Sequence, residues 1–171
     1  MLTLSLFRHA KSSWANPGQQ DFDRPLNERG LEAAPRMGAF MAEHGIGPDL
    51  ILSSPSARTR QTLDLLLPHF STRPTVLYED AIYLGAASTL LKRVRKLEAG
   101  VRHAMIVAHD PGLHQLAMHL PGSGDPDVLQ TLALKFPTAA LAVIVFQGRS
   151  WSKVKAGAGR LELFMTPKRL S

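Results

Sequence analysis

The sequence contains no cysteine and no long hydrophobic run. The absence of cysteine among 171 residues excludes disulfides, thiolate metal sites and cysteine nucleophiles. No apolar stretch approaches the roughly 20 residues of a membrane span, and the apolar run over residues 2–7 is too short for a signal peptide. Basic residues are not interleaved with aromatic ones, as they are in single-strand binders. We therefore expect a cytoplasmic protein that binds neither membranes nor nucleic acid.

Several cofactor and catalytic motifs are also missing. The chain has no P-loop lysine motif, no Gly-x-Ser-x-Gly and no His-Glu-x-x-His. Residues 122–124 read Gly-Ser-Gly but follow a predicted helix rather than a strand, which is the wrong context for a dinucleotide fingerprint. His109, His114 and His119 are five residues apart and cannot share one face of a helix. We expect no metal and no cofactor.

Composition is that of one globular domain, here expected over residues 1–171. Apolar residues make up 44% of the chain and charged residues 20%, which is close to the globular average. The formal net charge of +6 comes from 20 basic and 14 acidic residues, with most of the excess from Arg149 onward. A positive field that steers anionic substrates explains this charge better than a nucleic-acid surface does.

Strand-like and helix-like segments alternate along the chain. Such alternation predicts an α/β fold, a three-layer αβα sandwich with a mainly parallel central sheet. The last three predicted strands add an antiparallel edge. A turn-rich loop is expected over residues 121–127. Strands are predicted over residues 2–7, 49–53, 74–78, 104–108, 131–136, 140–147 and 160–165, and helices over 27–43, from 53–55 to about 68, 86–97 and from 110–111 to about 120.

Three polar clusters directly follow three of the parallel strands. Arg8 and His9 follow the first strand, Arg58 lies five residues after the second, and His109 follows the fourth. Because parallel strands present their carboxyl ends at one edge of a sheet, we expect these side chains to meet there. Guanidinium groups bind phosphate oxygens in a bidentate fork, and a neutral imidazole is a nucleophile toward phosphorus. The edge is therefore predicted to bind a phosphoryl group.

Four motifs follow one another along the chain. They are Arg8-His9-Ala10-Lys11-Ser12, the helix opening at 26–30, a second-arginine motif at 53–62 and a second-histidine motif at 107–111. In this order they resemble the motifs of the histidine phosphatase (phosphoglycerate-mutase-like) superfamily. The short length and residues 21–26, Asp-Phe-Asp-Arg-Pro-Leu, are similar to the SixA-type phosphohistidine phosphatases, which lack the large helical lid of other members.

The resemblance implies a role for each matching residue. His9 would be the nucleophile that forms a phosphohistidine intermediate. Arg8, Arg58 and His109 would form the phosphate pocket, with Ser12 as a lesser contributor.

Two features near these motifs stay open. Larger relatives carry a carboxylate general acid after the third strand, where this chain has Glu79 and Asp80. Ala108 and Asp110 replace the usual Gly and Asn on either side of the second histidine. The Asp110 charge would either keep His109 protonated or repel substrate.

The expected activity is that of a metal-independent phosphatase. Its expected substrate is phosphohistidine on a signalling or phosphotransfer protein of the histidine-phosphotransfer type. One alternative is a phosphatase for small phosphomonoesters such as sugar or nucleotide phosphates. Another is a non-catalytic module that recognises phosphate. Mutase activity is disfavoured because the chain is too short for a lid that would retain a phosphorylated intermediate.

Overall fold

Seven strands and five helices make up the computed structural model, which describes residues 1–170. The strands are β1 Leu2–Arg8, β2 Leu50–Ser53, β3 Thr75–Tyr78, β4 His103–Ala108, β5 Pro121–Gly124, β6 Leu141–Phe146 and β7 Gly159–Met165. The helices are α1 Glu28–Glu43, α2 Ala57–Leu66, α3 Ala87–Val94, α4 Gly112–His119 and α5 Pro126–Leu134. Within residues 1–170, no helix is both long and apolar enough to span a membrane.

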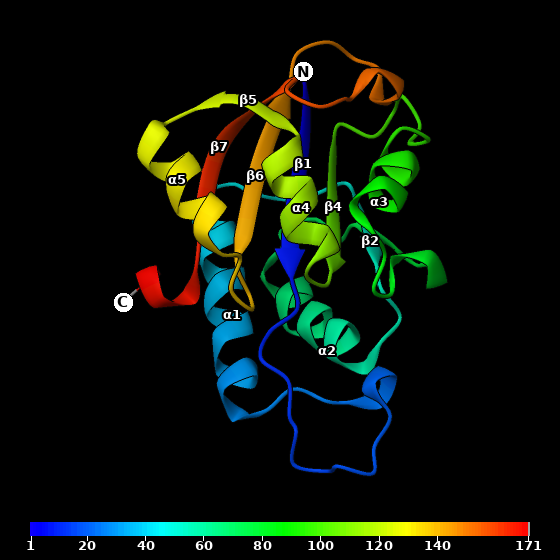
Figure 1. Ribbon diagram of the computed structural model, residues 1–171, viewed down its shortest axis with the longest axis vertical. Coiled ribbons are helices and arrows are strands. Elements are labelled where there is room, and N and C mark those ends of the chain that lie inside the picture. The colour runs from blue at the N-terminus through cyan, green and yellow to red at the C-terminus, as the bar shows by residue number, and fades with distance from the viewer. Residues whose placement is uncertain (171) are drawn as a thin grey trace.

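The strands form one sheet in the order β3-β2-β4-β1-β6-β7-β5, with helices on both faces (Figure 1). β3, β2, β4 and β1 are mutually parallel, whereas β6 runs antiparallel to both β1 and β7. Buried residues of α1 and α2 pack in one core cluster, and those of α3 and α4 pack in a second cluster. The predicted αβα sandwich with a mixed sheet is confirmed.

Helix α1 begins where the sequence predicts. Asn27 is its N-cap, and its side-chain oxygen accepts a hydrogen bond from the Gly30 N–H at 2.9 Å. Gly30 is needed here because a Cβ at that position would lie 2.2 Å from the Lys11 carbonyl oxygen. The helix therefore packs tightly against the loop that follows His9. Pro35 lies inside the helix without ending it.

Helix α2 begins later than predicted. Its N-cap is Ser56, which accepts a hydrogen bond from the Thr59 N–H, so Pro55 lies before the helix rather than in its first turn. The predicted helix start at residues 53–55 is therefore wrong. Ser54 instead remains available for contacts at the edge of the sheet.

The predicted strand over residues 131–136 is also wrong, because most of that segment is helical. Asp125 caps α5 by accepting hydrogen bonds from the N–H groups of Asp127 and Val128, and Pro126 is the first helical residue. The apolar residues after the cap continue the helix to Leu134. The loop predicted at 121–127 contains the edge strand β5 and the start of α5.

Candidate active site

The pairing of β1 with β4 brings the two predicted histidines together. The strands are parallel neighbours with Arg8 opposite Ala108, so His9 and His109 leave the sheet side by side. The His9 N–H donates to the Ala108 carbonyl at 3.1 Å, and the two imidazole centroids lie 5.3 Å apart. Both side chains are buried, with 6% of His9 and 2% of His109 exposed. The residues line a cavity of about 250 Å³ at this end of the strands.

Both predicted arginines also line that cavity. Arg58 lies in the first turn of α2 and is buried, whereas Arg8 ends β1 and is half-buried. Among the residues that the structure describes, no acceptor lies within hydrogen-bond distance of the buried Nε atom of either arginine. A buried donor without a partner is costly. An oxyanion in the cavity is the ligand that fits two such donors.

His9 is neutral and has one defined tautomer. Its Nδ1 lies 2.7 Å from the Ala10 carbonyl oxygen, which only accepts hydrogen bonds, so Nδ1 carries the proton. Burial, together with the charges of nearby Arg8 and Arg58, lowers the pKa of His9 to about 3. At neutral pH the Nε2 atom therefore keeps its lone pair. This is the form of imidazole that attacks phosphorus.

His109 is likewise neutral. Its Nε2 lies 2.7 Å from the Ser54 hydroxyl oxygen, and burial together with the charge of nearby Arg58 lowers its pKa to about 3. Its buried Nδ1 has no partner within the described part of the chain. The two histidines can thus supply a lone pair and a neutral N–H to the same ligand.

Asp110 acts on Arg8 rather than on His109. Its Oδ2 lies 3.6 Å from Arg8 Nη1, and burial raises the pKa of Asp110 although the Arg8 charge opposes this. The low pKa of His109 argues against the alternative in which Asp110 keeps that histidine protonated. Instead, the carboxylate of Asp110 partly offsets the positive charge of Arg8.

Neither of the expected general acids joins the cavity. Glu79 accepts two hydrogen bonds from Arg93, at 2.7 Å and 2.9 Å, and this ion pair holds its carboxylate away from His9. Asp80 begins the short turn after Glu79 and does not line the cavity either. A general acid after the third strand therefore stays a prediction, and in this structure neither carboxylate lines the cavity.

Arg24 is a cavity residue that sequence reasoning missed. Its Nη1 donates to the Ser12 hydroxyl at 2.8 Å, and its guanidinium lies 3.5 Å from the Trp14 ring centroid. Ser12 also lines the cavity, as predicted, and Trp14 is 76% exposed above Arg24. The only sequence signal for Arg24 was the resemblance of residues 21–26 to the SixA-type phosphatases. That segment has neither helix nor strand periodicity. The position of Arg24 depends on the fold of a loop.

Asp21 connects this loop to the buried arginine. Its backbone carbonyl and its Oδ2 accept hydrogen bonds from Arg58, at 2.8 Å and 3.1 Å, and its Oδ1 accepts from Arg24. Tyr83 donates its hydroxyl to the same carboxylate. Burial acts to raise the pKa of Asp21, but these hydrogen bonds and the Arg58 charge hold that pKa at about 2. Asp21 thus fixes the orientation of two cavity arginines.

Comparisons with known proteins agree with this geometry. Residues 4–80 match the profile of the Histidine phosphatase superfamily (branch 1). An uncharacterised protein of Mycobacterium tuberculosis is 31% identical over 163 residues, which cover 94% of this chain and 99% of the relative.

Solved structures are similar over nearly the whole chain. A protein assigned as the phosphohistidine phosphatase SixA of Agrobacterium tumefaciens is 33% identical, with a TM-score of 0.80 and coverage of 97% of this chain and 98% of the other. A protein assigned in the same way from Nakamurella multipartitia is 28% identical, with a TM-score of 0.83 and coverage of 97% and 96%.

The low pKa of His9 predicts its behaviour in an NMR titration. The ¹⁵N shifts of the free protein should report an Nδ1–H tautomer that stays constant between about pH 5 and pH 8, because protonation begins only near the pKa of about 3. A titration with a midpoint near the ordinary histidine value of about 6.5 would contradict this assignment.

The contacts of Asp21 predict a loss of phosphate affinity on substitution. In Asp21→Asn an amide N–H faces a guanidinium, so we expect kcat/KM for an aryl phosphate to fall by about tenfold, mainly through KM. The matched control is Asp23→Asn, since the Asp23 side chain makes no hydrogen bond or ion pair within residues 1–170. Equal kinetics for the two variants would show that Asp21 does not position the arginines.

Proposed function

Because this chain belongs to the histidine phosphatase superfamily and is a phosphatase, we propose that it hydrolyses phosphohistidine on a signalling or phosphotransfer protein. The observation that carries the proposal is the neutral His9, whose Nε2 lone pair is available beside the cations of Arg8, Arg24 and Arg58. A nucleophile and a cationic clamp are the two parts that phosphoryl transfer requires.

In the first step, His9 Nε2 attacks the phosphorus atom. A P–Nε2 bond forms while the bond from phosphorus to the substrate nitrogen breaks, and the electron pair of that bond stays on the substrate imidazole. The three arginines would bind the phosphoryl oxygens and so keep phosphorus in line with Nε2 and the leaving nitrogen. The guanidinium groups remain charged at any working pH. The Ala10 carbonyl keeps the Nδ1 proton of His9 and so fixes the ring during transfer.

His109 would donate to the same phosphoryl group. If the Ser54 hydroxyl donates to Nε2, the proton of neutral His109 lies on Nδ1, its second ring nitrogen. That N–H then donates to a phosphoryl oxygen without adding a full positive charge.

In the second step, water attacks phosphorus and the P–Nε2 bond breaks. The electron pair returns to His9 Nε2, inorganic phosphate leaves, and the proton of the water passes to phosphate or solvent. His9 is thereby restored to its neutral tautomer. No step requires a metal ion or another cofactor.

The position of the carboxylates favours a phosphoramidate substrate over an ester. Asp110 is the one carboxylate in the cavity lining within the described residues, and it is engaged by Arg8. An alkoxide leaving group needs a proton donor, whereas an imidazole protonated on its other nitrogen leaves as a neutral molecule. The absence of Glu79 and Asp80 from the cavity thus supports phosphohistidine as the substrate.

A substrate panel with a His9→Ala variant tests this proposal. With a chelator present, wild type should release phosphate from a phosphorylated histidine domain at least about tenfold more efficiently, in kcat/KM, than from sugar, nucleotide or aryl phosphates. His9→Ala should lose at least about 10³-fold in kcat on every substrate, as expected for removal of a nucleophile. His119→Ala, which changes an exposed histidine of α4, is the matched control.

Three outcomes would contradict the proposal in different ways. A preference for small phosphates would indicate a phosphomonoesterase. Phosphate binding without turnover of any substrate would indicate a recognition module. Full activity of His9→Ala would exclude the covalent mechanism itself.

A further inference from the structure

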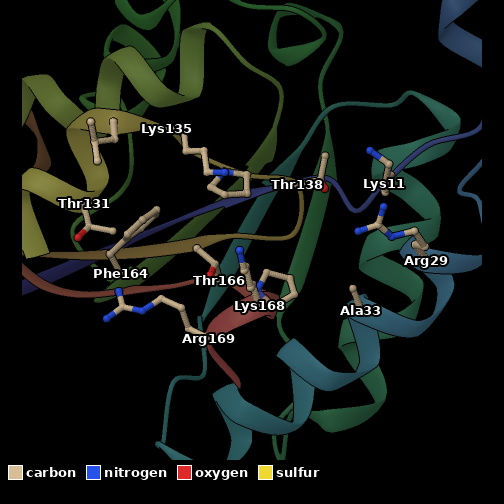
Figure 2. A pocket seen from close by; sticks show the side chains of 13 residues that line it. Lys11, Arg29, Ala33, Thr131, Lys135, Thr138, Phe164, Thr166, Lys168 and Arg169 are labelled. Carbon is tan, nitrogen blue, oxygen red and sulfur yellow. The ribbon is translucent and has the colours of Figure 1, made fainter. Parts of the chain in front are cut away.

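A second cavity lies beside the candidate active site. It has a volume of about 400 Å³, against about 250 Å³ for the cavity that holds His9. Lys11 and Thr138 line both cavities, so the two share a wall. Figure 2 shows side chains gathered around the second cavity from α1, α5, β7 and the C-terminal 3-10 turn η5 (Pro167–Leu170). We call this second cavity the basic groove.

The rim of the groove is strongly cationic. In the part of the chain that the structure describes, five exposed basic residues and no acidic ones line the groove. The five are Lys11, Arg29, Lys135, Lys168 and Arg169. Within residues 1–170, no carboxylate forms an ion pair with Arg29, Lys135 or Arg169. By contrast, Arg8, Arg24 and Arg58 at the active site each face an aspartate.

The groove also offers apolar surface. Phe164 of β7 is buried at its base, and Ala33 of α1 and Pro137 lie in its wall. Leu134, at the end of α5, is 80% exposed at the groove. An exposed leucine next to several cations matches a ligand that carries both apolar and anionic groups.

From this combination we propose that the basic groove docks an acidic segment of the phosphorylated protein substrate, with an apolar side chain placed among its acidic ones. The proposal rests on the proposed function, because it assumes that a protein carries the phosphate to His9. The shared wall at Lys11 and Thr138 lets one ligand occupy both cavities. A small phosphate ester would fill only the first.

Charge complementarity identifies the occupant as acidic. Exposed cations such as Arg29, Lys135 and Arg169 accelerate encounter with an anionic surface and fix its orientation, and this attraction weakens as the salt concentration rises. A nucleic acid is the less suitable polyanion, because it needs exposed aromatic rings on which its bases can stack. Among residues 1–170, the one aromatic residue that lines the groove is Phe164, which is buried. The groove thus selects among phosphoproteins by the residues near their phosphohistidine.

The kinetic test uses a charge-reversal variant away from the chemistry. Lys135→Glu combined with Arg169→Glu changes two residues that line the groove and not the His9 cavity. We expect kcat/KM for a phosphorylated histidine domain to fall at least tenfold through KM, whereas kcat/KM for an aryl phosphate stays within twofold. Lys153→Glu is the matched control, because this exposed lysine follows the end of β6, which lies beside the start of β1 and therefore away from the groove.

The binding test does not depend on turnover. The probe is a fluorescent peptide that contains several Asp and Glu residues and one Leu, titrated against the full chain. Wild type and His9→Ala should bind it equally, and the double variant at least tenfold more weakly, with an affinity that falls as salt rises. An oligonucleotide of equal charge should compete less well than the unlabelled peptide.

The outcomes separate the two proposals. If wild type does not dephosphorylate the protein substrate, the proposed function fails, and the peptide titration still decides whether the groove binds acidic segments. No binding of the peptide by wild type, or equal binding by the double variant, would overturn the groove proposal. So would stronger competition by the oligonucleotide.

Discussion

The parallel pairing of β1 with β4 is the constraint on which the site depends. Its register places Arg8 opposite Ala108, so that the next residue of each strand is a histidine at the same edge of the sheet. A slip of one residue would turn one of the two side chains to the other face. Buried side chains on both faces of the sheet, including Leu6, Phe7, Ile106 and Val107, fix this register. The geometry of the histidines is therefore a consequence of core packing.

The site also balances charge in a small buried volume. Three arginines and two histidines share one cavity, and protonated histidines there would be repelled by the arginines and deprived of water. Both imidazoles therefore have a pKa of about 3. In the unfolded chain the two histidines become protonated near pH 6.5. Their burial in the neutral form therefore lowers the stability of the fold as the pH falls below that value. Asp21 holds Arg24 and Arg58 from outside the cavity, whereas Asp110 pairs with Arg8 within the cavity lining.

The sequence was most informative where a local rule decides the structure. The predicted strand over residues 2–7 and the predicted helix over residues 27–43 match β1 and α1 closely. The segment at 131–136 failed because its apolar residues suit a strand or a helix, and the cap at Asp125 selected the helix. The position of Glu79 could not be predicted from local pattern, since its partner Arg93 is distant in sequence. That of Arg24 could not be predicted either, since its partner Asp21 lies in a loop. The basic groove joins residues as far apart as Lys11 and Arg169, so only the fold reveals it.

We propose that neutral His9 accepts the phosphoryl group on Nε2. The most direct measurement is rapid quenching of wild type during turnover without acid, followed by ³¹P NMR and peptide mass spectrometry. We expect phosphate on His9 alone, at Nε2, because Nδ1 is held by the Ala10 carbonyl. Phosphate on His109, on Nδ1 of His9, or on no residue at all would contradict it.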